Sequence, residues 1–181
     1  MPPRSRTALL VPARSEVTAV VADLLHDSGW AVTEAADGPV DALVFDPGLL
    51  RGDPDPDPAA TLQALVERTP FPARDDGGAA VVVIGSRDQL GRVADPRRAA
   101  LAGAVFAAAR SIALALAPSG VTVNVVAGVP TDGRRGLLPD APTLADVAGA
   151  VAFLADPRSR YITGQLLFCD AGDALLSSMS V

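Results

Sequence analysis

The chain has 181 residues, 49% of them hydrophobic, which is enough to bury one substantial core, and we expect a single domain over residues 1–181. Its 21 acidic and 15 basic side chains give a net charge of −6, which argues against nucleic acid and anionic membranes as main partners. The apolar run near the N-terminus is too short for a signal peptide, and we expect no later run to span a bilayer. The single cysteine, Cys169, excludes an internal disulfide and fits a reducing cytosol, so we expect a cytoplasmic protein.

The first 35 residues have the pattern of a strand–helix–strand unit. Thr7–Val11 predicts a short buried strand. Apolar residues at helical spacing follow it and predict a helix with Ser15 as its N-cap and Gly29 at its end. Trp30–Ala35 predicts a second strand.

The middle of the chain alternates between apolar runs and polar breaks. The segment Asp41–Gly48 contains the next apolar run. Residues 51–58, RGDPDPDP, are polar and broken by proline, which predicts an extended, solvated linker. Ala59–Thr69 predicts a short helix and Ala79–Ile84 a buried strand.

A long apolar helix over residues 97–117 is the most prominent predicted element. A buried strand, Val121–Val126, follows it after a tight turn. A helix that is hydrophobic all round is covered on every side, so one face should meet a sheet and another should meet more protein. We expect Val105, Phe106 and Ile112 on the outer face, exposed unless a partner covers them.

The C-terminal part predicts one more helix and one more strand. Asp132–Ala141 is a loop rich in glycine, arginine and proline. Thr143–Leu154 predicts a helix with one apolar face, and Ile162–Cys169 predicts the last strand. A short apolar tail over residues 174–181 ends the chain.

Two segments carry a resemblance to a known family. SIALALAPSGVTVNVVAG, in the long helix and the strand after it, is similar to the family pattern SLALELAPxGIRVNAVAPG. DVAGAVAFLADPRSRYITGQLLFCDAG is close to the pattern DVAxAVxFLASdxAxYITGQxLxVDGG. The chain thus resembles the short-chain dehydrogenase/reductase family, which implies an α/β, Rossmann-like three-layer sandwich with a mostly parallel sheet of about six strands. The family's third strand and substrate lid are expected to be missing.

The resemblance also places the family's cofactor motif, and this chain departs from it. Pro12, Glu16 and Thr18 stand where the three glycines of TGxxxGxG would be. Those glycines let the backbone approach a pyrophosphate at the helix N-terminus. Phe45 and Asp46 replace the asparagine pair that borders the cofactor. We therefore expect no nicotinamide cofactor, although Glu16 also has the simpler role of complementing the helix dipole.

The catalytic residues implied by the resemblance are mostly absent. Ser86 is retained by residue type, although a serine at a strand end is also a common turn former. The family's Tyr-x-x-x-Lys falls at Arg98 and Ala102, and the chain contains no lysine. Its only tyrosine, Tyr161, and its only asparagine, Asn124, both lie in other motifs. Because an arginine does not readily release a proton, we expect no catalytic residues of the usual kind and no independent oxidoreductase activity.

The leading hypothesis is a catalytically inactive subunit of this family, a pseudoenzyme. The family's catalytic residues and cofactor glycines are absent, whereas the segments that resemble its oligomer surfaces are present. We expect the chain to form oligomers with itself, with an active short-chain dehydrogenase or ketoreductase, or with both. The surfaces are the 97–117 helix and the 162–169 strand.

Two other hypotheses remain open at this point. The vacated cleft could serve non-redox chemistry, as in a cyclase, isomerase or dehydratase acting on a polyketide-like or acyl-CoA substrate. The polar groups available for it are Ser86, Arg98, Asp46 and Asp132. Alternatively, the chain could hold a nucleotide or CoA without reacting, with Arg14 beside a phosphate.

No metal site is expected. No cluster of histidine, cysteine and carboxylate residues has the spacing of metal ligands. The only histidine, His26, lies on the first predicted helix, away from the cleft, and we expect it to face solvent.

Overall fold

A computed structural model describes residues 5–12, 14–73, 77–91, 95–128 and 136–177. Its strands are β1 (Thr7–Val11), β2 (Ala31–Thr33), β3 (Ala42–Phe45), β4 (Ala79–Ser86), β5 (Val121–Gly128) and β6 (Leu166–Cys169). Its helices are α1 (Glu16–Asp27), α2 (Pro58–Arg68), α3 (Pro96–Leu116), α4 (Leu144–Ala155) and α5 (Asp173–Ser177). Short 3₁₀ turns include η2 (Arg87–Leu90), η3 (Ala117–Ser119) and η4 (Pro157–Ser159).

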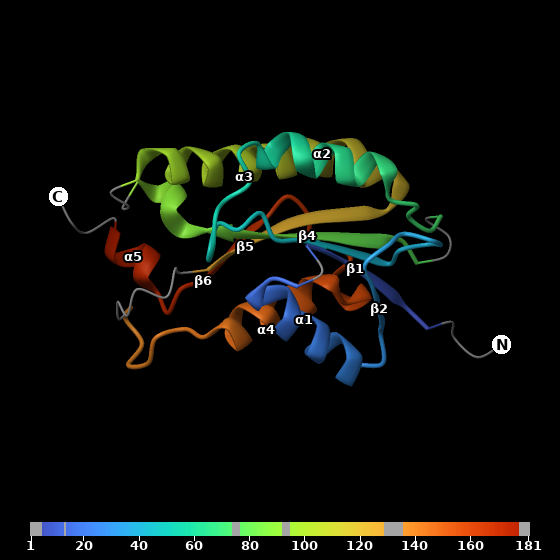
Figure 1. Cartoon of the computed structure of the whole chain (residues 1–181), viewed down its shortest axis with the longest axis horizontal. Coiled ribbons are helices and arrows are strands. Elements are labelled where there is room, and N and C mark those ends of the chain that lie inside the picture. The colour runs from blue at the N-terminus through green and yellow to red at the C-terminus, as the bar shows by residue number, and fades with distance from the viewer. Residues whose placement is uncertain (1–4, 13, 74–76, 92–94, 129–135, 178–181) are drawn as a thin grey trace.

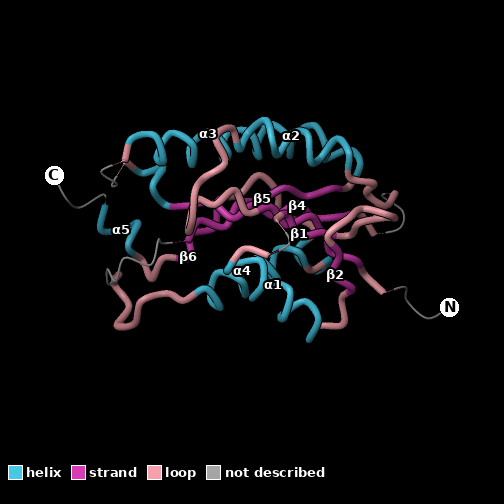
Figure 2. Tube along the Cα trace, in the orientation of Figure 1, coloured by secondary structure: helices cyan, strands magenta, loops and turns pink. Residues whose placement is uncertain are grey.

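The strands form one parallel six-stranded sheet in the order β2-β1-β3-β4-β5-β6. Helices α2 and α3 cover one face, and α1 and α4 cover the other (Figure 1). The sheet lies as one layer between the two helical layers (Figure 2). The predicted Rossmann-like sandwich of six strands is therefore confirmed. From β2 the chain passes directly to β3, on the other side of β1, so β2 is an edge strand of the described sheet.

Local side-chain hydrogen bonds explain where two of the helices begin. The Ser15 hydroxyl accepts from the Thr18 amide, and the Thr18 hydroxyl accepts from the Ser15 amide, so a capping box starts α1. Thr143 and Asp146 form the same motif at α4. Gly29, with φ of +80°, follows the end of α1 as predicted.

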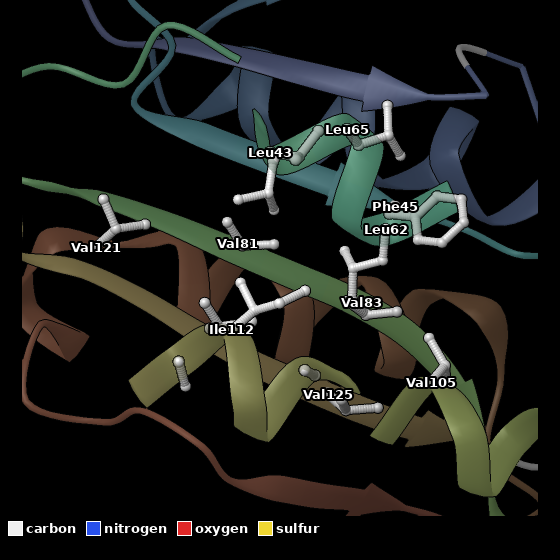
Figure 3. Packing of buried hydrophobic residues seen from close by; sticks show 14 of the residues in the cluster. Leu43, Phe45, Leu62, Leu65, Val81, Val83, Val105, Ile112, Val121 and Val125 are labelled. Atoms are coloured by element: carbon white, nitrogen blue, oxygen red, sulfur yellow. The ribbon is translucent and has the colours of Figure 1, made fainter. Parts of the chain in front are cut away.

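The predicted outer face of the long helix is wrong for two of its three residues. Val105 and Ile112 are buried and point toward the sheet, where they meet residues such as Val81 and Val125 (Figure 3). Phe106 is partly buried against the same cluster. The apolar residues of α3 therefore serve the core, since β4 and β5 present a valine-rich surface to this helix. The exposed side of α3 consists mainly of small residues.

Two strands are shorter than predicted. After Thr33 the strand β2 ends, because the Thr33 hydroxyl bonds to the backbone of Ala35. The first half of Ile162–Cys169 is not a strand. The buried Asn124 amide donates to the Ile162 carbonyl at 2.8 Å and accepts from the Gln165 amide at 3.1 Å, which shapes this segment as a bend before β6.

The expectation that no run could span a bilayer needs a correction. In the part of the chain that the structure describes, the helical segment Pro96–Ser119 is long and apolar enough to do so by length and composition alone. In the fold it packs against the sheet, as a core helix of an α/β domain does. The molecule accordingly resembles a soluble α/β domain.

Candidate functional site at the carboxyl edge of the sheet

The carboxyl ends of the parallel strands form the edge at which α/β proteins usually bind ligands, at the point where the strand order reverses. In this sheet that point lies between β1 and β3. The strand that follows β1 lies on one side of this point, and the strand that follows β3 lies on the other side. The N-terminus of α1, the loop after β3, η2 and α5 all lie at this edge. The loop of residues 46–53 is called the β3 loop below.

The N-terminus of α1 is occupied by the chain's own side chains. The Ser15 and Thr18 side chains are engaged in the capping box. Glu16, the first residue of α1, forms an ion pair with Arg51 of the β3 loop, with 2.6 Å between Oε2 and Nη1. A carboxylate therefore lies at the end of the helix that would otherwise favour an anion.

Asp46 is a buried carboxyl group at the end of β3. It accepts a hydrogen bond from the Gly48 amide at 3.0 Å. Burial raises the pKa of the Asp46 carboxyl above its ordinary value, and hydrogen bonds from the Ser15 side chain and the Gly48 amide oppose that rise. A buried carboxyl group is either neutral or negatively charged, so Asp46 offers no attraction for a phosphate.

Most of residues 51–58 are exposed, as predicted for a solvated linker, but the chain folds back on the β3 loop here, so the prediction that this segment is extended is wrong. The Asp55 amide donates to the Pro47 carbonyl at 2.9 Å, and Asp57 caps α2. Gly48 has φ of +73°, and a Cβ there would lie 2.6 Å from the Asp53 carbonyl oxygen. Only glycine fits this turn without displacing the backbone.

Ser86 acts as a cap in this structure. Its side chain is buried at the end of β4, and its hydroxyl accepts a hydrogen bond from the Asp88 amide at 3.2 Å. This contact starts η2. The turn-forming role considered for this serine therefore accounts for its position.

Arg98 lies on α3 and is tied to the β3 loop. Its guanidinium donates to the carbonyl oxygens of Gly48, Leu49 and Gly52 at 2.8, 3.2 and 3.3 Å. Its Nε also lies 3.9 Å from the buried Asp88 carboxylate. One turn further along α3, Ala102 is buried in the core and offers no polar group.

A second arginine at this edge was missed by sequence reasoning. Arg87 follows Ser86 directly and forms a buried ion pair with Asp173 at the start of α5. Asp170 is also buried, and its carboxylate accepts from the amides of Gly172 and Ala174. The sequence shows an arginine after a buried strand, but no local pattern identifies a partner near the other end of the chain.

The other predicted groups lie apart from this cluster. Arg14 pairs with Glu34 at 3.5 Å on the surface, and His26 is exposed as expected. Asp132 lies outside the described residues. Among the described residues, no group of three histidine, cysteine or acidic side chains could hold a metal ion.

Several cavities lie away from Ser86 and Arg98. A groove of about 540 Å³ runs between residues 138–142 and the end of β6, beside Cys169. Burial, together with Asp146 and Asp170, raises the pKa of the Cys169 thiol, which favours its unreactive form. A cavity of about 370 Å³ lies between α1 and β2, and one of about 80 Å³ lies at the amino ends of the strands. Neither Ser86 nor Arg98 lines these spaces.

Comparison with known proteins identifies the family. No family model matches the chain. It is 34% identical over 186 aligned residues to the (2S)-[(R)-hydroxy(phenyl)methyl]succinyl-CoA dehydrogenase subunit BbsC of Thauera aromatica, covering 90% of this chain and 74% of BbsC. It is 30% identical over 112 residues to subunit BbsD of that dehydrogenase from the same organism, covering 54% of this chain and 45% of BbsD.

The fold comparison agrees with the sequence comparison. An oxidoreductase of the short-chain dehydrogenase/reductase family from Burkholderia thailandensis matches with a TM-score of 0.76 at 18% identity, covering 95% of this chain and 94% of that one. The chain belongs to the short-chain dehydrogenase/reductase family. The resemblance in the two motifs is thereby confirmed. The two Thauera relatives are, by name, subunits of one enzyme.

Proposed function

We propose that the chain is a non-catalytic subunit of the short-chain dehydrogenase/reductase family that assembles with an active member of that family. The observation that supports this proposal is that the chain has no lysine and only one tyrosine, Tyr161, so it cannot supply Tyr-x-x-x-Lys. Arg98, which the motif alignment puts at the tyrosine position, is bonded to three backbone carbonyls. A guanidinium does not readily release a proton, so an arginine cannot take the role of the tyrosine hydroxyl. We also propose that the chain binds no nicotinamide cofactor and works in the cytoplasm.

The relatives support the idea of a mixed assembly. BbsC and BbsD are named as two subunits of one dehydrogenase, and this chain is similar to both. A protein that pairs with an active relative needs its interface surfaces and has no need for a second set of catalytic residues.

The exposed side of α3 suits close approach by another helix. Exposed residues recur along it at alternating intervals of four and three, at Ala100, Ala104, Ala107, Ser111 and Leu114. Intervals of this kind form the contact line between two packed helices, and small side chains let the axes approach closely. Leu114 is 81% exposed in the single chain, which a partner helix would cover.

A second proposed surface includes β6 and the end of α4. β6 is an edge strand of the sheet, and Leu167 on it is partly exposed. Phe153 on α4 and Tyr161 are also large and exposed. These three side chains would contribute apolar area to a subunit contact.

Light scattering tests the proposal. The chain would be purified alone and after co-expression with a short-chain dehydrogenase from the same genome that keeps Tyr-x-x-x-Lys. We expect a stable mixed complex whose reductase activity is lost when the partner's tyrosine or lysine is replaced. A monomer that ignores every such reductase would overturn the proposal.

Matched surface variants locate the interface. Leu114→Asp places a charge at the C-terminal end of the proposed helix contact, on its largest exposed apolar side chain, and should abolish the complex. Leu138→Asp changes another exposed leucine, outside both proposed surfaces, and should leave the complex intact. Equal loss in both variants would argue against the α3 surface.

A further inference from the structure

An exposed arginine flanks the proposed contact line on α3. Arg110 is exposed, and its guanidinium carbon lies 5.7 Å from the centre of the Phe106 ring. Among the described residues, no carboxylate forms an ion pair with Arg110. The helix contains three arginines and no acidic residue. A helix that packs against α3 therefore meets positive charge that nothing on α3 itself neutralises.

Arg110 and Gly103 lie on the same side of this contact line. The line runs from Ala100 to Leu114, with Ala107 at its middle, and at 3.6 residues per turn both flanking residues fall beside it. When two helices pack, charges at such flanking positions influence the choice of partner. A Cβ added at Gly103 would have no atom within 4 Å outside its own stretch of the helix, so this position is open.

Pairing of two copies through this line lacks a compensating charge. In an antiparallel two-fold contact centred on Ala107, Arg110 lies nearly level with Gly103 of the second copy, which has no side chain to meet it. The two Arg110 side chains lie on the same side of the contact, about 9 Å apart along the axis, a distance at which salt screens their repulsion only in part. A parallel contact offers no better pairing, because α3 has no acidic residue.

We propose that Arg110 selects a partner helix that carries an aspartate or glutamate at the position equivalent to Gly103. This inference rests on the mixed complex proposed above and names the chemistry of its second helix: small residues along the contact line and a carboxylate beside it. One ion pair at the margin of a contact contributes modestly. The same arginine also repels its own copy in a self-paired dimer, and the two effects together favour the mixed pair.

Gly103→Glu supplies the missing carboxylate within the chain itself. Each added carboxylate faces Arg110 of the second copy, so we expect self-association, measured by sedimentation equilibrium, to tighten about five- to tenfold. Gly149→Glu is the matched control, because Gly149 is a glycine of α4 that also has no atom within 4 Å of an added Cβ. That control should leave self-association unchanged. Adding Arg110→Gln to Gly103→Glu should remove the gain, and a gain that survives it would contradict the proposed pairing.

Variants of Arg110 test the choice of partner in the mixed complex. Arg110→Gln removes the attraction, and Arg110→Glu adds repulsion, so the affinity for the active reductase should fall about threefold and about tenfold, respectively. Both losses should shrink as salt is added. If the complex forms and both variants bind as tightly as the parent, the selection by Arg110 is wrong while the subunit role stands.

Failure of the subunit role itself has a different signature. In that case no reductase forms a complex with the parent chain, whatever residue stands at position 110. The self-association of Gly103→Glu needs no second protein and decides the charge argument by itself. Self-association equal to that of the parent would overturn the proposal.

Discussion

Two corners of the carboxyl edge use the same chemistry in different surroundings. At the N-terminus of α1, Glu16 pairs with Arg51, and the two side chains are 61% and 38% exposed. At η2, Arg87 pairs with Asp173, and the two side chains are 5% and 6% exposed. Exposed ion pairs contribute about 0–1 kcal/mol, whereas removing one partner of a buried pair costs about 3–5 kcal/mol.

The difference shows which changes this chain can tolerate. Around α1, where the family resemblance places the phosphate-binding motif, the chain has an exposed ion pair that water screens. Around η2, buried charges join segments from distant parts of the sequence. The first pair should therefore contribute little to stability, whereas the second should contribute much more.

The largest effect is expected at the buried corner. Arg87→Met removes the cation that pairs with the buried Asp173 carboxylate and should lower the free energy of unfolding by about 3–5 kcal/mol, measured by urea denaturation. The double variant Arg87→Met/Asp173→Leu replaces both charges by apolar groups and should recover much of the loss. A loss below about 1 kcal/mol in the single variant would mean that the two corners do not differ.

Arg98, between the two corners, should have an intermediate effect. Arg98→Met keeps much of the apolar stem but loses the hydrogen bonds to three carbonyl oxygens, and we expect a loss of about 2–3 kcal/mol. Arg97→Met is the matched control, since Arg97 is its exposed neighbour on the same helix. Equal unfolding midpoints for the two variants would contradict the role assigned to the Arg98 contacts.

The pH dependence of stability in an Asp46 variant tests the electrostatics of the α1 corner. Because burial raises its folded pKa above the ordinary 3.8, the folded chain holds this proton more tightly than the unfolded chain does. The carboxyl group therefore destabilises the fold increasingly as pH rises through that raised pKa. Asp46→Asn should be more stable than the parent at pH 7, and the difference should vanish below pH 3.8.

Thermal unfolding across this pH range checks the Asp46 prediction. An asparagine can still accept from the Gly48 amide, so the comparison isolates the charge. Asp23→Asn, at an exposed position on α1, is the control and should not reproduce this pH-dependent difference. A variant that is less stable than the parent at every pH would show that a lost hydrogen bond outweighs the charge.

The sequence predicted the fold well because the fold depends on local patterns. Valine-rich strands, the Ser15 cap and the end of α1 at Gly29 are all signals within a few residues of each other. The family motifs then supplied the Rossmann-like arrangement with a mostly parallel sheet of about six strands. The outer face of α3 was wrong because a nearly uniform apolar helix gives no periodicity from which to orient it.

The site was predicted less completely, because its contacts join distant segments. Ser86 and Arg98 were singled out, but their actual partners, the Asp88 amide and the carbonyls of the β3 loop, belong to the fold and have no sequence signal. Arg87 and Asp173 were missed for the same reason, although each lies close to the end of a predicted strand. Charge pairing over such separations becomes visible only when the topology brings the segments together.

The smallest effect is expected at the exposed pair of the α1 corner. Arg51→Gln removes the cation beside Glu16 and should change the free energy of unfolding by less than about 1 kcal/mol, with the change shrinking further as salt is added. Glu16→Gln should behave similarly, because water solvates whichever partner remains. A loss as large as that of Arg87→Met, or one insensitive to salt, would mean that the β3 loop depends on Arg51 as well as on Arg98. The α1 corner would then support the fold in the same way as the η2 corner.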